Sequence, residues 1–175
     1  MSAAGAPRLR YLALGDSYTI GEGVAPEGRW PLQLARALRG EDVALDDPQV
    51  IATTGWTTDE LWAGIDAVAP SGPFDLVSLL IGVNNQYRGR PLDEYRTQFE
   101  ALLERAIALA GDRAGRVLVL SIPDWGATPF ARQSRRDRGL VARELDAFNQ
   151  AAREACERRG VAFVDITAHG RAHGA

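Results

Sequence analysis

Lysine is absent from this 175-residue sequence, and all twenty basic residues are arginine. Without lysine, the chain can form no lysine Schiff base and cannot supply the lysine of a phosphate-binding P-loop. The formal net charge of −3 gives no basic field of the kind that attracts nucleic acid. We therefore expect no nucleic-acid partner.

Cysteine and histidine are scarce. The sequence has one cysteine, Cys156, and two histidines, His169 and His173. A single cysteine cannot form an internal disulfide, and these three residues are too few for a structural zinc site. Cys156 stands among helix-forming residues, so we interpret it as a small packing residue.

Long apolar runs are also missing. No run approaches the length that spans a membrane, and the first ten residues, MSAAGAPRLR, lack the apolar core of a secretory signal. We therefore expect no membrane span and a cytoplasmic location.

Short apolar runs alternate with helical patterns along the chain. Continuous apolar character predicts strands at residues 10–15, 49–55, 74–82, 116–123 and 161–166. Helical spacing predicts longer helices at residues 30–40, 57–69, 91–111 and 139–160. Apolar strands separated by helices are typical of a parallel sheet covered on both faces. We predict one α/β domain over residues 1–175, a three-layer α/β/α sandwich with a five-stranded parallel sheet in the flavodoxin-like order 2-1-3-4-5.

Polar residues follow three of the predicted strands. Ser17 follows the first strand, Gly55 stands at the end of the second and Asn84 follows the third. Ligands of such sheets bind beyond the carboxyl ends of the strands. The Ser17 hydroxyl is a candidate nucleophile, and the Ser17 N–H, the Gly55 N–H and the Asn84 amide are candidate donors to a developing oxyanion. Taken singly, each position also fits an ordinary turn or helix cap.

Three stretches in this order carry a family resemblance: LALGDSYTIGEG, ATTGWTTDEL and LLIGVNNQYRGRPLDEY. They resemble the sequence blocks of the SGNH hydrolases, also called GDSL-type esterases and lipases. The resemblance implies that Ser17 is the nucleophile and that Gly55 and Asn84 belong to the oxyanion hole. Asn85 stands where the family commonly has aspartate. LSIPDWGATPFA is similar to the segment that these proteins carry after their fourth strand.

The family's last block, Asp-x-x-His, is not found in the closing stretch VAFVDITAHGRAHGA. Asp165 precedes His169 by four residues rather than three. We expect the family's aspartate and histidine to lie beyond residue 175, leaving His169, and less so His173, as candidate bases on a frayed tail. Without the family's last helix, an uncovered apolar patch near the C-terminus would favour self-association.

The resemblance implies a serine hydrolase that cleaves small-molecule carboxylic esters through an acyl-enzyme on Ser17. It implies no metal and no organic cofactor. One alternative is an impaired hydrolase or binding module of the same fold that lacks a positioned general base. Another is a flavodoxin-like FMN protein with Trp56 and Trp62 flanking the ring, although Asp16 would repel the phosphate.

Other motifs receive structural interpretations. Outside the FMN hypothesis, we expect Trp56 to form a cleft wall and Trp62 to pack on its helix. The basic segment 132–138 is expected to be a solvated helix entrance; the alternative is a rim that attracts anionic substrates.

Overall fold

Parallel strands form the central sheet of the computed structural model, which describes residues 8–173. The strands are β1 (Tyr11–Gly15), β2 (Gln49–Ala52), β3 (Leu76–Leu80), β4 (Val117–Leu120) and β5 (Ala162–Val164). Their order is β2-β1-β3-β4-β5, and each neighbouring pair is parallel. The predicted fold class and strand order are confirmed.

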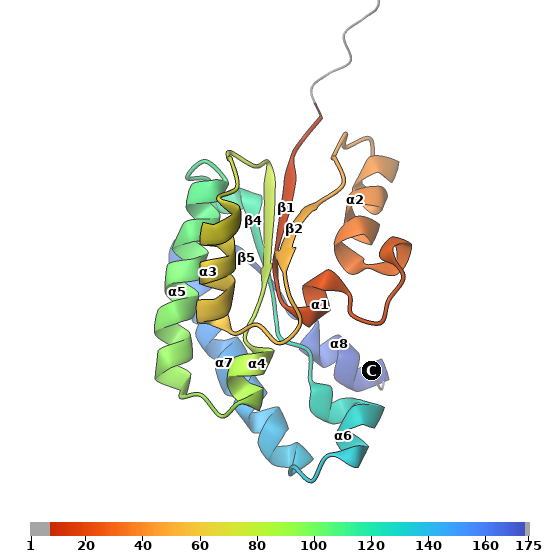
Figure 1. Ribbon diagram of the computed structural model, residues 1–175, viewed down its shortest axis with the longest axis vertical. Helices are drawn as coiled ribbons and strands as arrows, with labels where there is room; N and C mark the ends of the chain where they lie inside the picture. Colours follow the sequence, from red (N-terminus) through yellow and green to blue (C-terminus); the bar gives the residue numbers. More distant parts are fainter. Residues whose placement is uncertain (1–7, 174–175) are drawn as a thin grey trace, which may run out of the picture.

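The longer helices lie where helical spacing predicted them. They are α2 (Trp30–Gly40), α3 (Thr58–Val68), α5 (Leu92–Leu109) and α7 (Arg138–Arg159). Figure 1 shows α3, α5 and α7 on one face of the sheet and α2 on the other, which gives the three layers. Within the described residues, no helix is long and apolar enough to cross a bilayer.

Local signals explain where these helices begin and end. The Glu60 carboxylate accepts a 2.9 Å hydrogen bond from the backbone N–H of Thr57, which caps the start of α3. The Asp137 side chain accepts from the N–H groups of Gly139 and Leu140 at the start of α7. Gly160 ends α7 with a φ of 66°, a left-handed conformation that glycine adopts without strain.

Alternation along β1 divides the core in two. Leu12 and Leu14 join the larger apolar cluster on the side of α3, α5 and α7. Tyr11 and Ala13 point to the opposite face and pack with Ala35 of α2 in a smaller cluster. This two-sided burial explains why β1 is apolar at every position.

Short helices fill the connections, and the sequence analysis did not predict them. They are α1 (Ser17–Ile20), α4 (Val83–Tyr87), α6 (Pro129–Gln133), α8 (Thr167–His173) and the 3-10 turns η1 (Pro26–Gly28), η2 (Ala114–Arg116) and η3 (Trp125–Ala127). Helix α8 lies where we expected a frayed tail, so that expectation is wrong for residues 167–173. Asp165 caps α8 by accepting from the N–H groups of Thr167 and Ala168.

Candidate functional site

The turn after β1 presents Ser17 at the carboxyl edge of the sheet. The chain leaves the strand at Gly15, where an added Cβ would lie 2.1 Å from the Thr19 Oγ1 and 2.5 Å from the Leu80 carbonyl oxygen. Only glycine fits this close approach. Helix α1 then begins at Ser17, which is half-buried.

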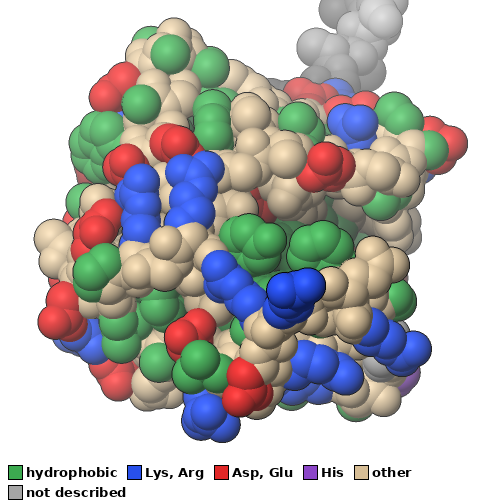
Figure 2. Space-filling view, turned by 60° about the horizontal axis from the view of Figure 1, so that its bottom comes forward, with side chains coloured by type: hydrophobic (Ala, Val, Ile, Leu, Met, Phe, Trp, Pro, Cys, Tyr) green, Lys and Arg blue, Asp and Glu red, His purple; other side chains and the backbone are tan. Residues whose placement is uncertain are grey.

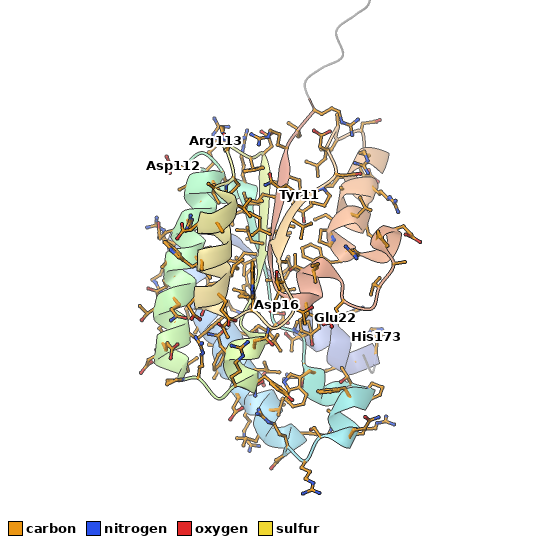
Figure 3. The ribbon with its side chains drawn as sticks, viewed as in Figure 1. Tyr11, Asp16, Glu22, Asp112, Arg113 and His173 are labelled. Carbon is orange, nitrogen blue, oxygen red and sulfur yellow. The ribbon has the colours of Figure 1, made fainter. Side chains whose placement is uncertain are left out.

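Asp16 precedes the serine and is fully buried. One carboxylate oxygen accepts a 3.0 Å hydrogen bond from the Tyr18 N–H and caps α1, whereas Oδ2 has no partner among the described residues. Burial raises the pKa of Asp16 to about 7, although the Tyr18 hydrogen bond opposes the rise. Figure 3 shows Asp16 and Glu22 near one end of the sheet, opposite the end where Asp112 and Arg113 lie.

Gly55 lies in the turn after β2 with a φ of 86°. This left-handed conformation favours glycine, although the nearest atom to an added Cβ, on Arg88, would be 3.8 Å away. Arg88 donates to the Gly55 carbonyl oxygen at 2.6 Å and to Glu60 at 3.2 Å. The Ser17 and Gly55 N–H groups have no hydrogen-bond acceptor within residues 8–173.

Two adjacent asparagines follow β3 and differ in their contacts. Asn84 donates through Nδ2 to the Trp56 carbonyl oxygen at 2.9 Å. Asn85 is fully buried; it accepts from the Thr58 N–H at 3.1 Å and donates to the Thr58 hydroxyl at 2.8 Å. Asn85 thus joins α4 to the start of α3, and Asn84 is left beside the pocket.

One pocket of about 580 Å³ brings the three predicted site residues together. Its lining comprises Ser17, Tyr18, Glu22, Thr54, Gly55, Val83, Asn84, Tyr87, Trp125, Thr128 and Phe130. Figure 2 looks toward this end of the molecule and shows hydrophobic side chains grouped in a hollow, with arginine side chains along its edge. The pocket is therefore lined by residues that follow different strands, as expected for a parallel sheet, in which ligands bind beyond the carboxyl ends of the strands.

The aromatic part of this lining was missed by the sequence analysis. Tyr87 ends α4, Trp125 opens η3 and Phe130 lies in α6. The sequence signal for these three aromatic residues was weak, because the helices that carry them are too short to show a periodic apolar pattern. Trp125 alone could have been found, because it follows the end of the fourth strand.

The expectation that Trp56 forms a cleft wall is wrong. Trp56 does not line the pocket; its ring packs over Gly64, where an added Cβ would lie 2.2 Å from it. Trp62 is 39% exposed, with the Arg105 guanidinium 4.5 Å from its ring centroid. Since neither indole lines the pocket, the FMN hypothesis loses its ring-stacking residues.

The basic segment 132–138 does more than face solvent. Arg136 donates to the Tyr87 carbonyl oxygen and lies 4.6 Å from the centroid of that ring. Arg138 donates to the Gly126 carbonyl oxygen at 2.6 Å. These hydrogen bonds hold the segment against Tyr87, which lines the pocket, and against Gly126. The segment is therefore not a purely solvated helix entrance.

The two histidines lie on α8 and do not line the pocket. Their ring centroids are 4.2 Å apart, and His173 Nδ1 lies 2.9 Å from the His169 carbonyl oxygen. Asp165 pairs with Arg153 at 2.9 Å and caps α8, so it does not orient either imidazole. In the described part of the chain, no group of three or more His, Cys, Asp or Glu side chains is arranged to hold a metal ion.

The interpretation of Cys156 as a packing residue agrees with its placement. It is fully buried in the larger cluster, and burial raises the pKa of its thiol to about 12. A neutral thiol in the core is a poor nucleophile.

Comparison with known proteins places this site in context. A family model described as "GDSL-like Lipase/Acylhydrolase family" matches residues 13–175. A search of curated proteins found no match to this chain.

Similar folds occur among solved structures. AlinE4, an SGNH-hydrolase family esterase, has a TM-score of 0.68 at 22% identity, over 92% of this chain and 77% of its own. Axe2, an acetyl xylan esterase from Geobacillus stearothermophilus, solved as a W215I variant, has a TM-score of 0.68 at 20% identity, over 94% and 79%. The psychrotrophic esterase EstA from Pseudoalteromonas sp., in a structure inhibited by monoethylphosphonate, has a TM-score of 0.66 at 18% identity, over 89% and 76%.

Proposed function

Because this chain belongs to the GDSL-like lipase/acylhydrolase family, we propose that it is a serine hydrolase that cleaves carboxylic esters through an acyl-enzyme on Ser17. The observation that carries the proposal is the pocket that Ser17, Gly55 and Asn84 line together. Its structural neighbours AlinE4 and Axe2 are named as esterases, which agrees with an ester as substrate.

The reaction begins when the Ser17 Oγ attacks the ester carbonyl carbon and its proton passes to a base. The carbonyl oxygen becomes an oxyanion, which the N–H groups of Ser17 and Gly55 and the second N–H of the Asn84 amide stabilise. The tetrahedral intermediate then collapses: the bond to the alcohol oxygen breaks, the protonated base returns its proton to that oxygen, and the acyl group stays on Oγ. Water attacks this acyl-enzyme, releases the acid and restores the serine.

The pocket presents few candidates for the base. The pKa of Tyr18 is raised to about 12 by burial and by the charges of Asp16 and Asp124, so its phenol stays protonated near neutral pH. Glu22 lines the pocket, and its carboxylate accepts a 3.1 Å hydrogen bond from the Thr54 hydroxyl. Neither histidine reaches the lining.

This placement of the histidines favours a second candidate, an impaired hydrolase or binding module that uses the same pocket. Without a positioned base, oxyanion donors and substrate binding still support about 10³- to 10⁴-fold catalysis over water. The two candidates therefore differ in the rate at which Ser17 reacts, not in the pocket that binds the ester.

An active-site phosphonate tests the proposal directly. We expect a fluorophosphonate probe to label the folded protein at Ser17, with the modified peptide identified by mass spectrometry. Ser17→Ala should abolish labelling. Ser71→Ala, which alters an exposed serine outside the pocket, should leave it unchanged. Labelling as slow as that of free serine would favour the second candidate, and labelling at another serine would overturn the assignment of Ser17.

A further inference from the structure

The pocket that Ser17 lines has both polar and aromatic lining residues. Glu22 and Thr54 come from the loops that follow α1 and β2 and supply polar groups. Tyr87, Trp125 and Phe130 come from α4, η3 and α6. These three rings are called the aromatic wall below.

The rings of the aromatic wall contact each other edge to face. The centroids of Tyr87 and Trp125 are 5.4 Å apart with planes at 66°, and those of Trp125 and Phe130 are 6.0 Å apart at 62°. This is the geometry that aromatic quadrupoles prefer. A further ring can extend such an arrangement, by stacking or edge-on, without disturbing it.

Hydrogen bonds hold the middle ring of the aromatic wall, that of Trp125, in place. Trp125 is 5% exposed, and its Nε1 donates to the buried Gln86 side chain at 2.9 Å. Gln86 in turn donates to Glu144 of α7 at 2.6 Å. This chain of hydrogen bonds fixes the indole before any ligand arrives, so ordering it costs little on binding.

The outer rings are open to solvent. Tyr87 is 41% exposed and Phe130 is 58% exposed. Both rings contact Trp125 and line the pocket, so their exposed faces are available to a ligand in it. Arg136 lies against the Tyr87 ring and donates to its backbone, which holds that ring in place.

We propose that the aromatic wall binds an aromatic ring of the ester substrate, so that aryl-bearing esters are the preferred class and Phe130 is a specificity-determining residue. The reaction on such an ester rests on the proposed function, whereas binding of the ring does not. The pocket volume of about 580 Å³ accommodates a ligand the size of a naphthyl ester.

Binding of 2-acetonaphthone, a ketone analogue of a naphthyl ester that cannot be hydrolysed, tests the wall without any chemistry. We expect wild-type protein to bind it in calorimetric titration and Phe130→Ala to bind it about tenfold more weakly, since one aromatic contact is lost. Phe130→Leu should be weakened nearly as much, because leucine keeps apolar volume but not the ring. Leu140→Ala, which alters an exposed apolar residue outside the pocket, should bind like wild type.

Three binding results would overturn the proposal: no binding by wild type at millimolar ligand, equal affinity of wild type and Phe130→Ala, or full retention of affinity by Phe130→Leu. If esters are hydrolysed, Phe130→Ala should also lower kcat/KM for 2-naphthyl acetate about tenfold more than it lowers kcat/KM for ethyl acetate. If Ser17 fails to react with phosphonates while the ketone binds normally, the proposed reaction is rejected. The proposed binding of an aromatic ring is not affected by that result.

Discussion

Asn84 and Asn85 are neighbours in sequence with separate tasks. Asn84 lines the pocket and fixes its amide on the Trp56 carbonyl oxygen, whereas Asn85 is buried and bonds twice to Thr58. A change at the first should therefore affect chemistry, and a change at the second should affect stability.

We expect Asn84→Ala to lower kcat by about 10²- to 10³-fold, because one oxyanion donor is lost. Its free energy of unfolding should change little. Asn85→Ala should lower the free energy of unfolding by roughly 1–3 kcal/mol, because buried groups of Thr58 lose their partner. Ester hydrolysis and urea unfolding measure the two effects, and an Asn84→Ala protein as active as wild type would contradict the oxyanion role.

The buried carboxyl of Asp16 should make stability depend on pH. Its pKa is about 7 in the folded chain against an ordinary value of 3.8, so the folded state holds the proton more tightly than the unfolded state. This contribution to stability is fully present below about pH 4 and is lost as the pH rises through about 7. Asp16→Asn stays neutral throughout.

We therefore expect Asp16→Asn to gain stability relative to wild type between pH 4 and pH 7, by up to a few kcal/mol, and to gain no more above that range. Urea unfolding across this pH range measures the difference. A difference between Asp16→Asn and wild type that stays constant with pH would show that Asp16 titrates normally.

Helix α8 contacts the segment between β4 and η3 through Thr167, which donates to the Ile122 carbonyl oxygen at 2.8 Å, and through Arg171. Arg171 contacts Asp124 at 2.7 Å, Asp146 at 2.8 Å and the Ala142 carbonyl oxygen at 3.2 Å. Asp124 is nearly buried and caps η3, the turn that carries Trp125. The last helix is thus joined to both α7 and the aromatic wall.

Arg171→Met should cost about 1.5–3 kcal/mol in the free energy of unfolding, because it leaves the buried Asp124 charge without its partner. It should also raise KM for naphthyl esters more than it changes kcat, since η3 loses support. The control is Arg158→Met, which breaks the exposed ion pair with Glu100 and should cost about 0–1 kcal/mol. Equal losses in both variants would show that α8 does not support the pocket.

Other contacts near the C-terminus bear on self-association. Val164 on the edge strand β5 is 44% exposed, whereas the Arg153 guanidinium lies 4.6 Å from the ring centroid of Phe163. Association of two copies through this edge stays a prediction.

At the scale of the whole molecule, the sheet does most of the positioning. The strands were predictable because a short, continuously apolar run is typical of a strand buried on both faces. The Ser17, Gly55 and Asn84 loops were predictable because parallel strands end at one edge. The short helices were not, because four to seven residues carry no helical period. The prediction for Trp56 was wrong because its position next to Gly55 in the sequence suggested a pocket residue. The sequence alone does not show that the Trp56 ring packs over Gly64.

The position of both histidines outside the pocket lining predicts that an added small base accelerates the reaction of Ser17. Since neither histidine lines the pocket in the described part of the chain, external imidazole should accelerate reaction of Ser17 roughly tenfold at high concentration, a small part of what a positioned base supplies. The rate of phosphonate labelling measures this, with Ser17→Ala in imidazole as the blank. Fast labelling that imidazole does not change would mean that Ser17 already has its base.

The division of the pocket between separate stretches of chain also matters for redesign. Ser17, Gly55 and Asn84, the residues of the proposed reaction, follow β1, β2 and β3, whereas Trp125 and Phe130 belong to a segment that follows β4. Selectivity could thus be exchanged by grafting another protein's loop over residues 125–136, which keeps Asp124 and Asp137, provided that the graft also keeps an indole within reach of Gln86. The strand-end turns would need no alteration.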